Sequence, residues 1–266
     1  MTNNLFEIFD NHTGNEIYKW EHYFDIYEKH FSKFKNSTTP ITVLEIGVLN
    51  GGSLQMWQKY FGPNATIVGI DIYEDCKKFE KENIKIRIGS QADKSFLKEL
   101  TNEFPQIDVL IDDGSHRVLH QIITFEFLFK FITLGGVYLV EDTHTSYWVE
   151  YGGGKKRSGT FLEFSKKVID SLYARYSEQK GFEVDYYTEN LYSIHFYDSI
   201  VCFDKRKTQI PITLKRGVKE PDRISKYSEL KKSIFFKFSY TILLSLNKIL
   251  QFFNLSGFIL NGSKKK

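Results

Sequence analysis

Short, nearly continuous apolar runs alternate with helical patterns between residues 42 and 143, and this alternation limits the fold more than any other feature. The runs read "TVLEIGV", "TIVGIDIY", "IKIRIGS", "IDVLIDDGS" and "GGVYLVEDT". Strands that are apolar on both faces are typical of parallel sheets covered by helices on each side. The sequence therefore predicts an α/β fold with a doubly wound, mostly parallel sheet of seven strands.

The remaining segments complete the expected organisation. Residues 1–38 are predicted to be helical, because aromatic side chains recur there at three- to four-residue spacing. The α/β domain is expected to span residues 39–206. It ends in a helix at 160–178 and two close strands, "LYSIHFY" and "SIVCFDKR", which predict an antiparallel pair finishing the sheet. Residues 207–232 are polar and charged, and we expect a linker there.

Residues 233–266 form an apolar segment that ends in a run of lysines. At helical spacing, Lys237, Thr241, Ser245 and Lys248 fall on one face, whereas apolar side chains fall on another. The polar stripe and the internal lysines favour an amphipathic helix on a membrane surface over a spanning helix, with residues 233–260 in contact with the lipid. The alternative is a helix that docks on the protein's own core or on a partner subunit.

Charge and cysteine content limit the partners and the compartment. The 36 basic and 33 acidic residues are interspersed, so we expect no nucleic-acid partner. Cys76 and Cys202 are far apart and have no metal-type spacing, which favours a reducing compartment. The N-terminus is polar and has no apolar core of a signal peptide. We expect a cytoplasmic protein that forms a homo-oligomer, with peripheral contact at the cytoplasmic face of the membrane.

The end of the first predicted strand has the features of a ligand-binding turn. In doubly wound sheets, ligands bind at the carboxyl ends of the strands near the point where strand order reverses. This end carries Glu45, Gly47, Gly51 and Gly52, followed by Ser53 in the first turn of the next helix. The spacing departs from the dinucleotide pattern G-x-G-x-x-G. It suits a ligand with a cationic amino-acid end and no pyrophosphate.

The next two strand ends supply polar groups for the rest of such a ligand. Asp71 ends the second strand, where its two oxygens can accept both hydroxyls of a ribose; capping the next helix is the alternative. Ser90 and Gln91 follow the third strand, where an adenine would lie. Together with the glycine turn, these positions favour a nucleoside-containing cofactor.

Two acidic pairs follow the fourth and fifth predicted strands, as Asp112-Asp113 and Glu141-Asp142. Gathering like charges at neighbouring strand ends costs free energy unless a cation lies among them. His116 stands three residues after Asp113, and an imidazole can exchange a proton near neutral pH. The pattern predicts a cation site with a base beside it.

Four segments in order resemble a known enzyme family: "VLEIGVLNGGSLQMW", "IVGIDIY", "IDDGSH" and "YLVEDTHTSYW". They are similar to the metal-dependent sugar O-methyltransferases of the class I S-adenosylmethionine superfamily, which include the macrolide-sugar methyltransferases of the mycinamicin type. The resemblance covers roughly residues 16–206. It implies a methyltransferase domain that transfers a methyl group from S-adenosylmethionine to a sugar hydroxyl.

The resemblance also implies roles for individual residues. Asp113, Glu141 and Asp142 match the family's ligands for a divalent ion, usually Mg²⁺. His116 matches its general base, and Asp112 is left for the cofactor side or for orienting the turn. Hard oxygen donors with room for water and substrate are what Mg²⁺ requires.

The segment after the last acidic pair is where we expect the acceptor. His144, Tyr147 and Trp148 are candidates for contacts with a sugar, and a surface position is the alternative for each. A tail suited to membranes favours a cell-surface glycan or glycolipid precursor. Two other functions stay open: a non-haem iron hydroxylase of small molecules, and a non-catalytic partner that binds S-adenosylmethionine.

Overall fold

The computed structural model describes residues 4–177, 182–218, 234–253 and 255–257. The chain divides into two compact units, Met1–Pro211 and Ile212–Lys266. The predicted linker and tail begin near this division, and much of the linker lies outside the described residues.

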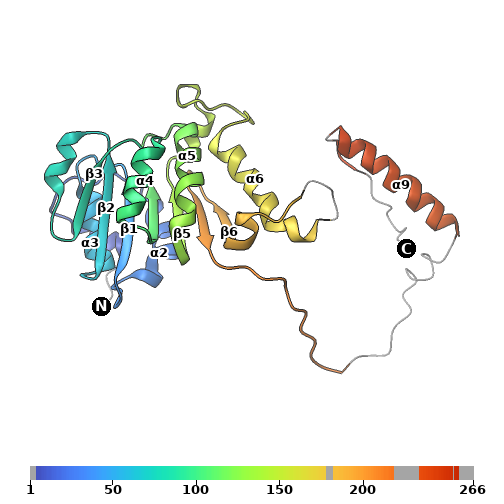
Figure 1. The fold of residues 1–266 in the computed structure, drawn as a ribbon, viewed down its shortest axis with the longest axis horizontal. Coiled ribbons are helices and arrows are strands. Elements are labelled where there is room, and N and C mark those ends of the chain that lie inside the picture. Colours follow the sequence, from blue (N-terminus) through green and yellow to red (C-terminus); the bar gives the residue numbers. More distant parts are fainter. Residues whose placement is uncertain (1–3, 178–181, 219–233, 254, 258–266) are drawn as a thin grey trace. The chain divides into compact units, whose positions relative to one another are not determined.

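The first unit contains one seven-stranded sheet of order β3-β2-β1-β4-β5-β7-β6 (Figure 1). Strands β1 to β5 pair in parallel, whereas β7 is antiparallel to both β5 and β6. The predicted fold class is confirmed, including the antiparallel pair at the end. The strands are β1 Ile41–Ile46, β2 Ala65–Asp71, β3 Ile84–Ile88, β4 Ile107–Asp112, β5 Ile132–Val140, β6 Leu191–Phe196 and β7 Val201–Lys205.

Helices cover both faces of the sheet, because successive residues of each strand are apolar on opposite sides. Val43 of β1 belongs to the hydrophobic core shared with α1 to α3, and its neighbour Leu44 belongs to the core shared with α4 to α6. The helices are α1 Leu5–Asp10, α2 Tyr23–Phe31, α3 Gly52–Phe61, α4 Lys94–Glu103, α5 Val118–Leu128, α6 Phe161–Tyr173 and α7 Tyr186–Asn190.

Two helical predictions need correction. Within the expected helical segment 1–38, residues 11–22 form a loop between α1 and α2. The Asn15 backbone N–H donates to the Gln55 side-chain oxygen, and the Asn15 side chain donates to the Asn50 carbonyl, so hydrogen bonds to the α3 region hold this backbone out of a helix. The helical pattern expected between the second and third strands is a 3₁₀ segment, Glu74–Phe79. Other 3₁₀ segments are Ser32–Phe34, Phe129–Phe131, Thr143–Tyr147, Val149–Tyr151 and Ala174–Tyr176.

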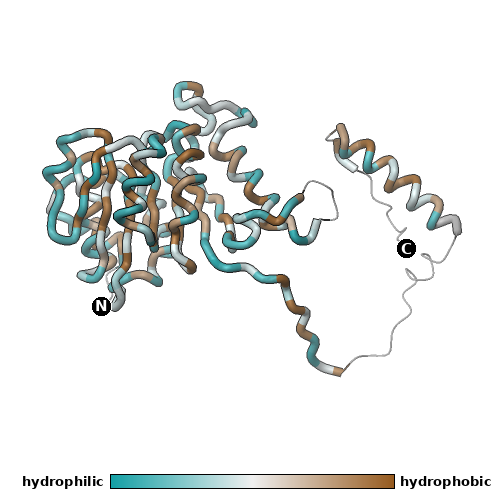
Figure 2. The backbone as a smooth tube through the Cα atoms, viewed as in Figure 1, coloured by the Kyte–Doolittle hydropathy of each residue, from teal (hydrophilic) through white to brown (hydrophobic). Residues whose placement is uncertain are grey.

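The second unit contains α9, Ile234–Phe252, which agrees with a helix in the C-terminal segment. Its hydroxyl groups at Thr241 and Ser245 donate to carbonyls one turn earlier, at Lys237 and Thr241. Figure 2 shows hydrophobic and hydrophilic stretches alternating along this helix. Among the described helices, none has the length and apolar character that crossing a membrane requires.

Candidate active site

A cavity of about 670 Å³ opens where the strand order reverses, at the carboxyl ends of the central strands. The loop 11–22 closes one side of it and the turns after β1 to β5 form the rest. Its lining residues include Tyr18, Lys19, Trp20, Gly47, Asp71, Ser90, Gln91, Asp113, His116, Glu141 and Asp142.

The glycine turn after β1 is built for close approach of two strand ends. Gly47 has a φ of 94°, and a Cβ there would lie 2.2 Å from the carbonyl oxygen of Asp113. The Asp71 carboxylate accepts hydrogen bonds from the backbone N–H groups of Val48 and Leu49, at 2.9 and 3.1 Å, and from Tyr73 at 3.0 Å. Asp71 thus shapes the turn while lining the cavity, and its carboxylate has lone pairs left for a ligand.

Four other predicted cofactor residues lie behind the cavity wall. Glu45 is fully buried and accepts a 2.7 Å hydrogen bond from the Ser53 hydroxyl, and burial raises the pKa of Glu45 above its usual range. Gly51 is in the left-handed conformation that begins α3. Gly52 leaves space for the carbonyls of residues 15 and 16, which a Cβ would approach to within 2.3 Å. These residues support the turn instead of facing the cavity.

Gln91 holds the turn that carries the second acidic motif. Its side-chain amide donates to Asp112 at 3.0 Å and to Thr124 at 3.2 Å, and its oxygen accepts from the Ser115 N–H at 2.7 Å. Asp112 is almost fully buried, and burial raises its pKa to about 6. Asp112 is thus hydrogen-bonded within this turn, whereas Ser90 lines the cavity.

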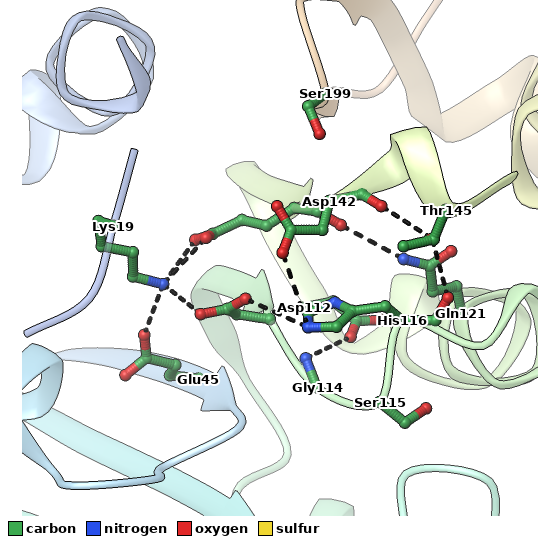
Figure 3. Close-up of polar contacts among 12 residues, drawn as sticks. Lys19, Glu45, Asp112, Gly114, Ser115, His116, Gln121, Asp142, Thr145 and Ser199 are labelled. Carbon is green, nitrogen blue, oxygen red and sulfur yellow. Dashed lines mark hydrogen bonds and ion pairs between the residues drawn. The ribbon is translucent and has the colours of Figure 1, made fainter. Parts of the chain in front are cut away.

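Asp113, His116 and Asp142 converge on the cavity, with ligand atoms all within 4.8 Å of one another. His116 Nε2 lies 3.9 Å from Asp113 Oδ1 and 3.7 Å from Asp142 Oδ2; Figure 3 shows the Asp142 carboxylate pointing at the imidazole. Both His116 and Asp142 adopt positive φ, 56° and 52°. The buried Thr145 hydroxyl joins them by reaching the carbonyls of His116 at 2.9 Å and Asp142 at 2.8 Å. The two carboxylates at adjacent strand ends fit a divalent cation, and the imidazole lies beside that position.

Lys19 is the main site residue that the sequence reading missed. Its ammonium group contacts Asp113 Oδ2 at 2.5 Å, both Glu141 oxygens at 2.9 and 3.0 Å, and Glu45 Oε1 at 3.5 Å (Figure 3). Burial alone would lower the pKa of Lys19, but the three carboxylates raise it well above its usual value. The Tyr27 hydroxyl donates a further 2.7 Å hydrogen bond to Glu141. Glu141, a predicted metal ligand, is therefore held by two donors of this chain.

Aromatic rings stand beside the acidic cluster. His144 stacks on Trp20 at 5.0 Å and packs edge-on against Trp148 at 4.8 Å, and its Nδ1 lies 2.5 Å from the Ser199 hydroxyl. Trp20 lines the cavity, so its stacking contact with His144 places the His144 ring next to the cavity wall. Tyr147 is 54% exposed.

The fold and this strand-end site define the class of Rossmann-like methyltransferases. No protein-family model matches the chain. The chain is 33% identical over 202 residues to the 8-demethyl-8-α-L-rhamnosyl tetracenomycin-C 2'-O-methyltransferase of Streptomyces olivaceus. The aligned region covers 73% of this chain and 52% of that protein. It is 34% identical over 190 residues to the demethylmacrocin O-methyltransferase of Streptomyces fradiae, and this alignment covers 67% of this chain and 47% of that protein.

Solved structures agree with these relatives. The MycE methyltransferase from the mycinamycin biosynthetic pathway, in complex with Mg and SAH, superposes with a TM-score of 0.70 at 29% identity, over 78% of this chain and 55% of that one. The structure of the same protein with Mg, SAH and mycinamycin VI superposes with a TM-score of 0.69. The chain belongs to this family of macrolide- and tetracenomycin-sugar O-methyltransferases, as the sequence resemblance indicated. It spans about half the length of the curated relatives it matches.

Proposed function

We propose that this chain is a divalent-metal-dependent enzyme that transfers a methyl group from S-adenosylmethionine to a sugar hydroxyl. The observation that carries the proposal is the convergence of Asp113, His116 and Asp142 on the wall of a cavity that the Gly47 turn also lines. The relatives support it: their names describe O-methyltransferases of glycosylated antibiotics, and the MycE structures contain Mg and SAH.

Each part of the cavity has a distinct task in this reaction. Asp113 and Asp142 would hold the divalent ion, with Glu141 beside them, and a bound ion lowers the pKa of a coordinated hydroxyl. His116 accepts the hydroxyl proton at Nε2, the nitrogen that faces both carboxylates. Asp71, Ser90 and the glycine turn would bind the cofactor, so that its methyl group faces the deprotonated oxygen.

The two alternative functions have less support. The iron site of a non-haem hydroxylase has two histidines and one carboxylate, whereas the cluster at the cavity has one histidine and two carboxylates. A non-catalytic binding partner would not need His116 and both acids to face one cavity.

The test uses the full-length chain with S-adenosylmethionine, Mg²⁺ and a panel of glycosides. We expect methyl transfer that stops with a chelator, returns with Mg²⁺, and falls at least about a hundredfold in His116→Ala. His120→Ala is the matched control, since His120 also lines the cavity. Its Nδ1 lies 2.8 Å from the Ser115 hydroxyl. Turnover that survives both the chelator and His116→Ala would refute the mechanism.

For the acceptor and location, we propose a cell-surface glycan or glycolipid precursor, methylated at the cytoplasmic face of the membrane by a homo-oligomer. The support is α9, which carries exposed apolar side chains and two lysines.

Cell fractionation tests the membrane part of this proposal. The chain should co-sediment with membranes, and Ile242→Glu combined with Leu246→Glu should release it; Lys215→Glu is a control outside the helix. Unchanged fractionation of the double variant would contradict membrane contact. Light scattering of purified protein measures the oligomeric state, and comparison of lipid-linked with diffusible sugars identifies the acceptor class.

A further inference from the structure

Lys19 divides the carboxylates of the site into two groups. Asp113 belongs to both: its Oδ2 contacts the Lys19 ammonium at 2.5 Å, whereas its Oδ1 lies on the side of His116. Glu45 and Glu141 lie on the lysine side only. Asp142 lies on the imidazole side, where its Oδ2 is 3.7 Å from His116 Nε2. The strand ends thus form two adjacent cation positions, one of which contains an ammonium group of the chain itself.

The lysine side is closed to solvent. Side-chain exposure is 3% for Lys19, 0% for Glu45 and 1% for Glu141, against 23% for Asp113 and 28% for Asp142. Removing one partner from such a buried charge group leaves the others uncompensated, which is strongly unfavourable. Asp113 and Asp142 are therefore the more accessible carboxylates of the site.

The position of Lys19 in the chain links this charge group to the cavity wall. Lys19 lies in the loop 11–22, and its neighbours Tyr18 and Trp20 both line the cavity. An extended loop without helical hydrogen bonds needs such anchors to keep its place. The contact between Lys19 and the strand ends therefore also holds these two aromatic side chains at the site.

We propose that Lys19 is a positioning residue, a resident cation that offsets part of the negative charge of Glu45, Glu141 and Asp113 in the absence of metal. The charge of Lys19 opposes that of a divalent ion bound between Asp113 and Asp142. The metal-free chain can then assemble its acidic strand ends, at the expense of metal affinity. The effect of Lys19 on metal affinity rests on the metal dependence of the proposed function.

The experiment compares wild-type protein with Lys19→Met and Lys19→Gln, which remove the charge, and with Lys19→Arg, which retains it. Calorimetry measures Mn²⁺ affinity, and thermal melting is recorded in EDTA and in saturating Mn²⁺. Lys205→Met is the matched control, because Lys205 is another buried lysine, bonded to the carbonyls of residues 129 and 130 at 3.2 and 2.8 Å.

Both neutral variants should melt at lower temperature in EDTA and bind Mn²⁺ about tenfold more tightly, because a nearby positive charge is gone. The rise in melting temperature with Mn²⁺ should exceed that of the wild type. Lys19→Arg should resemble the wild type, and Lys205→Met should lower the melting temperature without changing Mn²⁺ affinity. If Lys19→Met does not fold, Lys19→Gln gives the same comparison.

Equal or weaker Mn²⁺ binding by the neutral variants would overturn the opposition between Lys19 and the metal. An unchanged melting temperature in EDTA would overturn the compensating role. If the wild type binds no Mn²⁺, the metal dependence of the proposed function fails, and the melting temperatures in EDTA still decide whether Lys19 compensates the acids.

Discussion

The hydroxyl of Tyr23 donates a 2.6 Å hydrogen bond to Asp142 Oδ1, which leaves Asp142 Oδ2 directed toward His116. Outer hydrogen bonds of this kind orient metal ligands, and their loss commonly lowers metal affinity or activity by about tenfold or more. We therefore expect Tyr23→Phe to weaken Mn²⁺ binding about tenfold while the protein stays folded. Tyr138→Phe is the control, since among the described residues the buried Tyr138 hydroxyl has no hydrogen-bond partner. Equal affinity in the two variants would contradict the orienting role.

Gln91 connects the end of β3 to the turn that carries Asp113 and His116. Replacing it with Leu removes the amide that donates to buried Asp112 and the oxygen that accepts from Ser115. We expect a loss of about 2 kcal/mol in the free energy of unfolding and a lower kcat, measured by urea denaturation and methyl transfer. Ser90→Ala, at the neighbouring cavity position, should change stability little. A Gln91→Leu protein with wild-type stability would contradict this account.

Trp148 and Tyr147 are adjacent in sequence but differ in their packing. Trp148 packs on His144, which stacks on Trp20 of the cavity wall, whereas Tyr147 is more exposed. We expect Trp148→Ala to raise the KM for the sugar acceptor roughly tenfold, equivalent to about 1.4 kcal/mol, with kcat nearly unchanged. Tyr147→Ala should leave both constants near wild type. The reverse order of effects would place the acceptor on the other side of this segment.

Asp204, which is not part of the proposed active site, makes the free energy of unfolding depend on pH. Burial alone would raise its pKa, but contacts with His30 and Ser193 outweigh burial and lower the pKa to about 2; His195 Nε2 also lies 2.9 Å away, and Lys33 at 3.9 Å. A lowered pKa contributes stability above the unfolded value, near 3.9, that is lost as pH falls toward 2.

The corresponding variant is Asp204→Asn, with exposed Asp198→Asn as its control. The loss in unfolding free energy should be about 2 kcal/mol at pH 5 and roughly half of that at pH 3. Urea titrations at the two pH values measure it. A loss that is independent of pH would show that the Asp204 charge does not matter.

The fold was predictable because its signals are local. Each strand is a short apolar run, and the side chains of Val43 and Leu44 alternate between two cores as a covered parallel sheet requires. The acidic pairs were also visible, since Asp113 and Asp142 directly follow apolar strands. By contrast, aromatic spacing near Tyr18 predicted a helix where hydrogen bonds from the α3 region impose a loop.

The sequence by itself determined which strands exist, which acids stand at their ends and which family the chain resembles. Only the tertiary structure decided which of these groups face the cavity. In the folded chain Glu45 and Asp112 are buried, and Glu141 accepts hydrogen bonds from Lys19, which is 122 residues away in the sequence. Asp113, His116 and Asp142 lie together at the surface of the cavity. The physical reason is that buried charges must find partners, and the partner Lys19 comes from a loop whose aromatic spacing predicts a helix instead.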